Sequence, residues 1–211
     1  MNAYYLRFAL AWLVSVGVGC TSAPVRYYTL TAPPDKAVPA AETTVAIDVR
    51  VIHTPPQLNR AELMVRTGPG EVTLLENERW ASPVSDEIKE AVRLELQRRL
   101  GRMTGWRPAF ARLTLDIDVQ QLEAELGQYA LLDAFWRVSL SAAGRQSNPA
   151  WTTICRFQAE EKIQAGYAAM IEGYQRELAA LVDAIVIALT SSTSGSDALC
   201  HKSTEGSAGG R

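Results

Sequence analysis

Residues 167–189 have the sequence YAAMIEGYQRELAALVDAIVIAL and constrain the architecture more than any other segment. Their large apolar side chains recur at steps of three and four residues, which places them on one face of a helix. A long helix with one apolar face has to bury that face against another layer, so the segment predicts helix-on-sheet packing. The apolar face comprises Tyr167, Met170, Ile171, Tyr174, Leu178, Leu181, Val182, Ile185 and Leu189.

Six segments before this helix show the alternation of half-buried strands. The turn Thr67-Gly-Pro-Gly70 joins the second and third, which predicts a hairpin. The polar turn from Gly144 to Pro149 joins the last two, which predicts a meander. The six expected strands are residues 45–51, 62–66, 71–75, 113–119, 135–142 and 151–157.

A second helix is expected to begin at Ser82-Pro83 and to end at Gly101. Serine suits the N-cap, proline suits the first helical position, and Asp86 and Glu87 complement the positive end of the helix dipole. The resulting order, β-β-β-α-β-β-β-α, predicts an α+β fold in which two amphipathic helices cover one face of an antiparallel sheet. The apolar face of this helix comprises Ile88, Ala91, Val92, Leu96 and Leu100.

The N-terminus has the features of an export signal. Arg7 precedes an uncharged stretch, Phe8 to Gly19, and Cys20 follows. As a helix this stretch would span only about 18 Å, whereas a bilayer core is about 30 Å thick, so a cleaved signal is expected. The two small residues before Cys20 resemble a bacterial lipobox, although Gly17 stands where leucine is usual. We therefore predict a covalent lipid on Cys20; an ordinary signal with a chance cysteine is the alternative.

These features divide the chain into four parts. Residues 1–19 are a signal peptide, and residues 20–44 are a lipidated N-terminus and a linker rich in alanine and proline, with a short extended segment at Val25–Leu30. Residues 45–190 are the α+β domain, and the polar residues 191–211 are expected to be a disordered tail. With Cys20 acylated, Cys155 and Cys200 could pair in an oxidising compartment; the alternative is a buried Cys155 and a free thiol in the tail.

Composition excludes several classes of function. The net charge is −2 and no basic cluster occurs, so no nucleic-acid partner is expected. The two histidines, His53 and His201, and three dispersed cysteines cannot build a standard metal site, and no nucleophile elbow or phosphate-binding loop is present. Asp116 and Asp118 share a strand face as a carboxylate pair might, but their alternation with apolar residues favours a solvated strand face. We predict no catalytic residue and no metal.

Two segments are unusual enough to suggest a contact surface. A proline-stiffened loop, Val51 to Arg60, leads from the first core strand into the hairpin, and Glu78-Arg-Trp-Ala-Ser-Pro83 places a cation and a large aromatic before a helix. Because Trp and Arg are frequent interface anchors, the predicted partner interface comprises Pro56, Leu58, Arg60, Arg79 and Trp80. The alternative is that Trp80 packs beneath the helix as a core residue.

Taken in order, these motifs resemble the PqiC-type family of ABC-transport auxiliary lipoproteins. The resemblance rests on the lipobox, on Tyr27-Tyr-Thr-Leu30, on the Pro-Pro-x-Leu-x-Arg segment from Pro55 to Arg60, on Leu63 to Arg66, and above all on Arg79-Trp-Ala-Ser-Pro83. It extends from Tyr27 to Leu189. His53-Thr54 and the long polar tail depart from the family pattern.

The resemblance implies a non-enzymatic periplasmic lipoprotein of a Gram-negative envelope, with no cofactor beyond the lipid on Cys20. Relatives of this kind work with MCE-domain proteins that carry lipids between the two membranes, so this chain would dock such an apparatus at the outer membrane and support envelope integrity. Thr21, not aspartate, follows the cysteine, which agrees with outer-membrane sorting. A homo-oligomeric ring is a further expectation. The rival interpretations are a lipid carrier with its own apolar cavity and a peptidoglycan-binding anchor.

Overall fold

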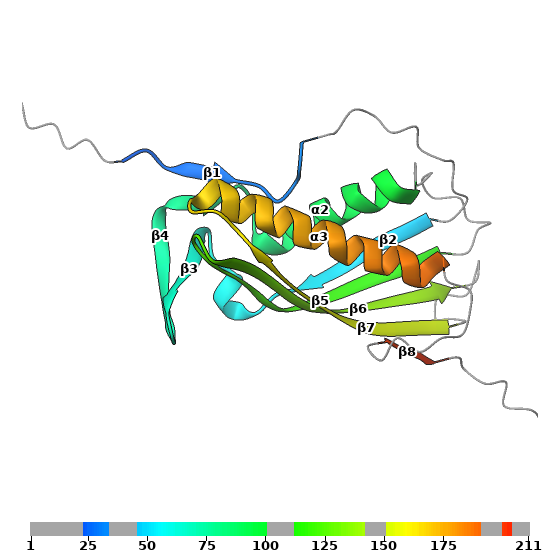
Figure 1. The fold of residues 1–211 in the computed structure, drawn as a ribbon. Coiled ribbons are helices and arrows are strands. Elements are labelled where there is room, and N and C mark those ends of the chain that lie inside the picture. The colour runs from blue at the N-terminus through cyan, green and yellow to red at the C-terminus, as the bar shows by residue number, and fades with distance from the viewer. Residues whose placement is uncertain (1–22, 34–45, 101–111, 142–150, 191–199, 204–211) are drawn as a thin grey trace, which may run out of the picture.

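The computed structural model describes residues 23–33, 46–100, 112–141, 151–190 and 200–203. Two long helices lie over one side of a curved five-stranded sheet, and a small three-stranded sheet closes one end of this sandwich (Figure 1). The elements are β1 (Arg26–Tyr28), β2 (Ala46–His53), η2 (Pro56–Leu58), β3 (Glu62–Gly68), β4 (Glu71–Trp80), α2 (Val84–Leu100), β5 (Arg112–Glu125), β6 (Tyr129–Ser141), β7 (Trp151–Lys162), α3 (Tyr167–Thr190) and β8 (Cys200–Ser203).

The α+β class and the order of elements from β2 to α3 are confirmed, but the sheet arrangement is more complex than the single antiparallel sheet that we expected. The larger sheet has the order β2-β5-β6-β7-β8 and the smaller β1-β4-β3. β2 pairs with β5 and β1 pairs with β4 in parallel, while the other pairs are antiparallel. Parallel pairing requires a crossover between the two strands, and the β3–β4 hairpin with α2 provides it between β2 and β5.

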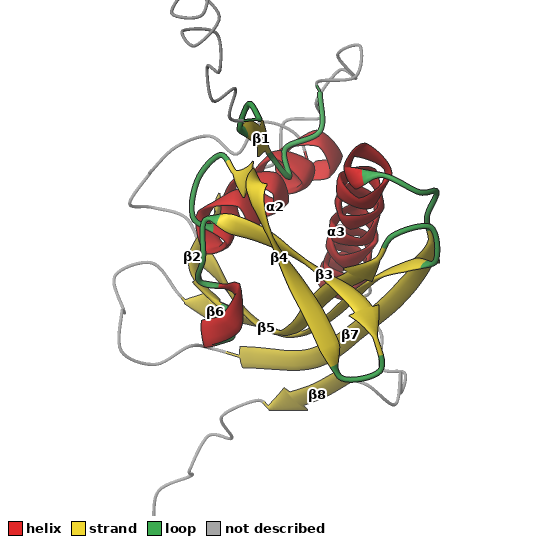
Figure 2. Cartoon of the chain, turned by 90° about the vertical axis from the view of Figure 1, so that its left-hand side faces the viewer, coloured by secondary structure: helices red, strands yellow, loops and turns green. Residues whose placement is uncertain are grey.

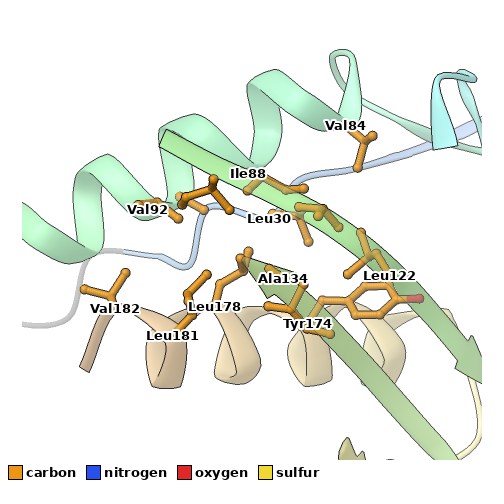
Figure 3. Close-up of a cluster of buried hydrophobic side chains, with 14 of the residues drawn as sticks. Leu30, Val84, Ile88, Val92, Leu122, Ala134, Tyr174, Leu178, Leu181 and Val182 are labelled. Atoms are coloured by element: carbon orange, nitrogen blue, oxygen red, sulfur yellow. The ribbon is translucent and has the colours of Figure 1, made fainter. Parts of the chain in front are cut away.

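Both helices bury their predicted apolar faces against the larger sheet and against each other. Figure 3 shows side chains of α2 and α3 meeting those of β5 and β6, with Leu30 inserted between the helices and the sheet. Leu30 is only 1% exposed, so the chain just after β1 is part of the core. The alternation expected in β5 is also confirmed, because Leu113, Leu115, Ile117 and Val119 are all buried.

Two strands are longer than the sequence indicated. β5 continues to Glu125 and β6 begins at Tyr129, so the two form a long hairpin rather than two separated strands. Gly127 makes the turn with a φ of 77°, a conformation that glycine adopts at little cost. In β2 the register with β5 shifts between Val49 and Val51, so the strict alternation of core-facing residues is interrupted there. After the shift, Ile52 is the residue that packs on the core.

The expected domain boundaries need two corrections. The folded region begins at β1 rather than at residue 45, because β1 pairs with β4 along Arg26 to Tyr28. The segment expected to be disordered, residues 191–211, contains β8, which pairs with β7. Without β8, β7 would be an edge strand with unpaired backbone N–H and C=O groups. A polar segment can form hydrogen bonds with these groups as well as an apolar segment can. Cys155 is disulfide-bonded, and Cys200 lies directly opposite it in the β7–β8 register.

Neither helix in the described ranges is both long and apolar enough to cross a bilayer. The expectations for the signal peptide and for Cys20 fall on residues 1–22, outside the described part of the chain.

Candidate functional site

The Arg79–Pro83 segment forms a structural junction between β4 and α2. Trp80 is 8% exposed, and its ring centroid lies 6.4 Å from that of Tyr174 on α3, with a tilt of 37° between the planes. Its backbone N–H donates to the carbonyl oxygen of Ala61 (2.8 Å), and the N–H of Ala81 donates to that of Tyr28 (2.8 Å). The junction therefore ties together β1, the start of β3, β4 and α3.

Two buried carboxylates fasten the N-terminal segment to this junction. Glu78 accepts hydrogen bonds from Arg26 Nε (3.0 Å) and from Tyr28 Oη (2.6 Å), and these bonds hold the pKa of Glu78 below its usual value despite some desolvation. Glu87, in the first turn of α2, accepts from Thr29 Oγ1 (2.7 Å) and from the backbone N–H of Leu30 (2.9 Å). Hydrogen bonds to a charged acceptor are stronger than neutral ones, so these contacts fix the position of Leu30 in the core.

Ser82 also contributes to this arrangement. Its hydroxyl donates to the other oxygen of Glu87 (2.8 Å), so the serine helps to hold this first-turn carboxylate in place. The backbone N–H of Glu87 in turn donates to Pro83 O (3.0 Å).

The position of Trp80 corrects one part of the predicted partner interface. A tryptophan that is 8% exposed and packed on Tyr174 is a core residue and leaves little surface for a partner. The sequence could not distinguish this from an exposed anchor, because an aromatic residue before a helix suits either role.

The other predicted interface residues lie at or near the surface. Pro56 and Arg60 are exposed, Leu58 is partly buried against the core, and Arg79 is half-exposed. Arg79 forms an ion pair with Glu62 (3.3 Å), two residues after Arg60. The structure therefore brings the two predicted segments side by side, although they are about twenty residues apart in the chain.

Asp116 lines a surface hollow of about 500 Å³ on the face of the larger sheet that the helices do not cover. One oxygen of Asp116 accepts from Arg50 Nη2 (3.1 Å), and the other is buried and has no hydrogen-bond partner within the described ranges. Asp118, Phe135 and Arg137 also line the hollow. The carboxylates lie among arginines in an open depression, and no group of His, Cys, Asp and Glu in the described residues could hold a metal ion.

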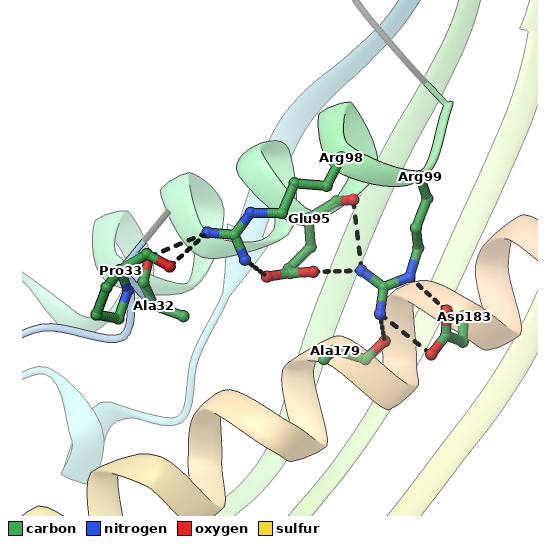
Figure 4. Close-up of polar contacts among 7 residues, drawn as sticks. All are labelled: Ala32, Pro33, Glu95, Arg98, Arg99, Ala179 and Asp183. Carbon is green, nitrogen blue, oxygen red and sulfur yellow. Dashed lines mark hydrogen bonds and ion pairs between the residues drawn. The ribbon is translucent and has the colours of Figure 1, made fainter. Parts of the chain in front are cut away.

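A guanidinium clamp joins the two helices. Arg99 of α2 donates from Nη2 to the carbonyl oxygen of Ala179 (3.1 Å) and to Asp183 (3.1 Å), both on α3, and also pairs with Glu95 (Figure 4). These bonds raise the pKa of Arg99 further, chiefly through Asp183. No local sequence pattern could predict the clamp, since Arg99 and its partners on α3 are about eighty residues apart.

Glu177 is a buried acid on the sheet-facing side of α3. It is 2% exposed, and neither carboxylate oxygen has a hydrogen-bond partner among the described residues. Burial, together with the nearby Glu161 and Glu160, raises its pKa to about 8, and the attraction of Arg176 offsets only part of this effect. Glu177 is therefore mainly neutral at pH 7.

Comparison with known proteins identifies the family. The model of the ABC-type transport auxiliary lipoprotein component matches residues 28–186, from the tyrosine that binds Glu78 to the last turns of α3. The chain belongs to this family. The match includes α2, most of α3 and the strands from β2 to β7, and it confirms the resemblance seen in the sequence. No curated protein matches this auxiliary lipoprotein in sequence.

Solved structures share the fold of this auxiliary lipoprotein. A crystal structure of an uncharacterised protein superposes with a TM-score of 0.60 at 16% identity and covers 80% of this chain and 100% of its own. A Xanthomonas campestris protein of the family DUF330 superposes with a TM-score of 0.50 at 17% identity and covers 78% of this chain and 93% of its own. At such identities the similarity concerns the fold alone.

Proposed function

We propose that this auxiliary lipoprotein is a non-enzymatic accessory subunit of an MCE-type intermembrane lipid-transport system. It is anchored through a lipid on Cys20 at the periplasmic face of the outer membrane, where it docks the transport apparatus and supports envelope integrity. The observation that carries this proposal is the family match over residues 28–186 of a chain that begins with a lipobox-like segment.

The packing of the domain supports an adaptor rather than a lipid carrier. A carrier needs an apolar cavity for a fatty chain, as binding pockets generally do. Between the helices and the sheet, side chains such as Leu115, Leu132, Leu178 and Ile185 are at most 1% exposed and fill the space. The hollow beside Asp116 lies on the opposite face and is lined by charged as well as apolar groups.

The proposed partner surface comprises Pro56, Leu58, Arg60 and the neighbouring Arg79. The proline-stiffened turn costs little backbone entropy to order on binding, and arginine is a frequent anchor of interfaces. A ring of identical copies would present this surface repeatedly around an axis.

Crosslinking in the native envelope tests the proposal. We expect the protein to recover an MCE-domain protein, and Arg60→Glu to reduce the yield, whereas Arg93→Glu, an exposed change on α2, leaves it intact. Recovery of no MCE-domain protein by any of the three chains would contradict the partnership. If lipid copurifies with a chain that lacks the covalent lipid on Cys20, the result would favour the lipid-carrier interpretation.

Fractionation tests the anchor separately. A Cys20→Ala chain is expected to leave the membrane fraction, and its continued association with membranes would show that the anchor lies elsewhere.

A further inference from the structure

The three-stranded sheet has an apolar outer face that is not covered by the described part of the chain. Among the described residues, seven large hydrophobic side chains are exposed, and four of them belong to this sheet or to the residue before it. They are Val25 (43% exposed), Tyr27 (65%), Val72 (50%) and Leu74 (40%). They lie at two places along β4, Val72 and Leu74 near the hairpin turn and Tyr27 beside Arg79. Exposed apolar side chains that recur along one face of a sheet indicate that the face makes a contact.

Strand pairing places these residues on one side of the sheet. In β3, Leu63 and Val65 turn into the core, so Met64 between them lies on the outer face, and its partner across the hairpin is Leu74. Val72, two residues from Leu74, shares that side. Tyr27 is in register with Arg79, while its neighbour Tyr28 is in register with the buried Trp80.

The arginines on this face have carboxylate partners. Arg66 turns to Glu123 of β5 (2.6 Å). Arg79 pairs with Glu62 (3.3 Å) at the end of the sheet beside Arg60, where this face borders the proposed partner surface. Pairing lowers the cost of bringing these charges close to an apolar phase. The face therefore offers apolar side chains and paired charges.

We infer that this outer face rests on the lipid bilayer to which Cys20 is anchored. The inference relies on the proposed acylation of Cys20, which lies only five residues before Val25. Five extended residues reach at most about 17 Å, so Val25 and Tyr27 cannot lie far from the bilayer surface.

The direction of the chain agrees with this placement. In Figure 1 the described residues before β1 leave the domain on the side of the three-stranded sheet, and Figure 2, viewed from that side, shows β3 and β4 at the front. Tyrosine is common at membrane–water interfaces, because its ring is apolar and its hydroxyl is polar. The tether and the apolar face therefore point to the same surface, and the covalent lipid provides affinity while the face sets orientation.

Site-specific photocrosslinking to lipid tests this orientation. The full lipoprotein, extracted from membranes, is reconstituted into vesicles of phosphatidylethanolamine and phosphatidylglycerol, with a photoreactive phenylalanine analogue at one position. Tyr27 and Val72 are the test positions. Thr73 is the matched control, since it is exposed on the same strand but belongs to the opposite face, and Phe135, an exposed aromatic residue on the larger sheet, controls for apolar exposure alone.

We expect phospholipid adducts, measured by mass spectrometry, to be several-fold more abundant at Tyr27 and Val72 than at Thr73 and Phe135. Equal yields at all four positions, or adducts at Val72 only with another protein or a second copy, would overturn the inference. Failure of acylation gives a different result, because the protein would then not float with the vesicles at all.

Discussion

Replacing Glu177 with glutamine should remove a large pH-dependent destabilisation of the fold. The carboxyl group has a pKa of about 8 in the folded protein, because burial disfavours the charged form, and of 4.5 when water surrounds it, as in the unfolded chain. As the pH rises from 4.5 towards 8, the unfolded chain releases this proton before the folded one does. The free energy of unfolding of the wild-type protein therefore decreases between pH 4.5 and 8. Below pH 4.5 the carboxyl group is protonated in both the folded and the unfolded state, so its titration does not change the stability.

The size of the effect follows from the two pKa values. Proton linkage gives a cost of about 1 kcal/mol at pH 5 and about 4 kcal/mol at pH 8. Glutamine has nearly the same shape and does not titrate. The free energy of unfolding of Glu177→Gln, minus that of the wild type, should thus increase by about 3 kcal/mol between these pH values.

Urea unfolding at pH 5, 6, 7 and 8 measures this difference, because the titrations common to both proteins cancel. Glu172→Gln is the matched control on the same helix, because it makes the same substitution at a carboxylate that is largely exposed. A flat profile for Glu177→Gln would refute the reasoning, since it would mean that the carboxyl is solvated and charged in the folded state.

Three further changes test the packing by urea unfolding. Trp80→Ala should cost about 3 kcal/mol because it leaves a cavity against Tyr174, whereas Arg79→Ala should cost less than about 1 kcal/mol; equal losses would argue against a core role for Trp80. Arg99→Ala should lower stability by about 1 to 2 kcal/mol through loss of the bonds to α3, and Arg93→Ala, whose partner Glu90 is on the same helix, should have a clearly smaller effect. Gly173→Ala should destabilise, because the new Cβ would lie 2.7 Å from Ile163 Cγ2 and 3.0 Å from Ala130 Cβ. Overpacking of about 1 to 3 kcal/mol outweighs the gain in helix propensity of about 1 kcal/mol, and an unchanged midpoint would show that Ile163 and Ala130 move aside to admit the methyl group.

Local patterns were sufficient to predict most of the secondary structure. The periodicity of α3 and the alternation in β5 arise from burial on one face, which a sequence shows directly. The long β5–β6 hairpin was predicted only in part, because Gln121 to Glu125 consists largely of good helix formers whose strand conformation is imposed by pairing with β6.

Contacts between distant segments could not be predicted. The pairing of β1 with β4 joins residues about fifty positions apart, and the same distant segment provides Tyr28 as a hydrogen-bond donor to Glu78 and Leu30 as a donor to Glu87. The sequence identified Arg79 and Trp80 as unusual, but their distinct roles depend on which side of β4 faces the core. The apolar outer face likewise emerges only when β1, β3 and β4 are assembled.

The parallel pairing of β1 with β4 has a mechanical consequence for a chain held by its N-terminus. Tension applied before Val25 would pull β1 along its own axis, so its hydrogen bonds to β4 and the Arg26–Glu78 contact would bear the load together in shear. Beyond β1, the bond from Leu30 N–H to Glu87 passes any remaining force into the start of α2. Thermal motion of a membrane or a pull from a partner would thus be resisted at the first strand, before it could peel the domain open.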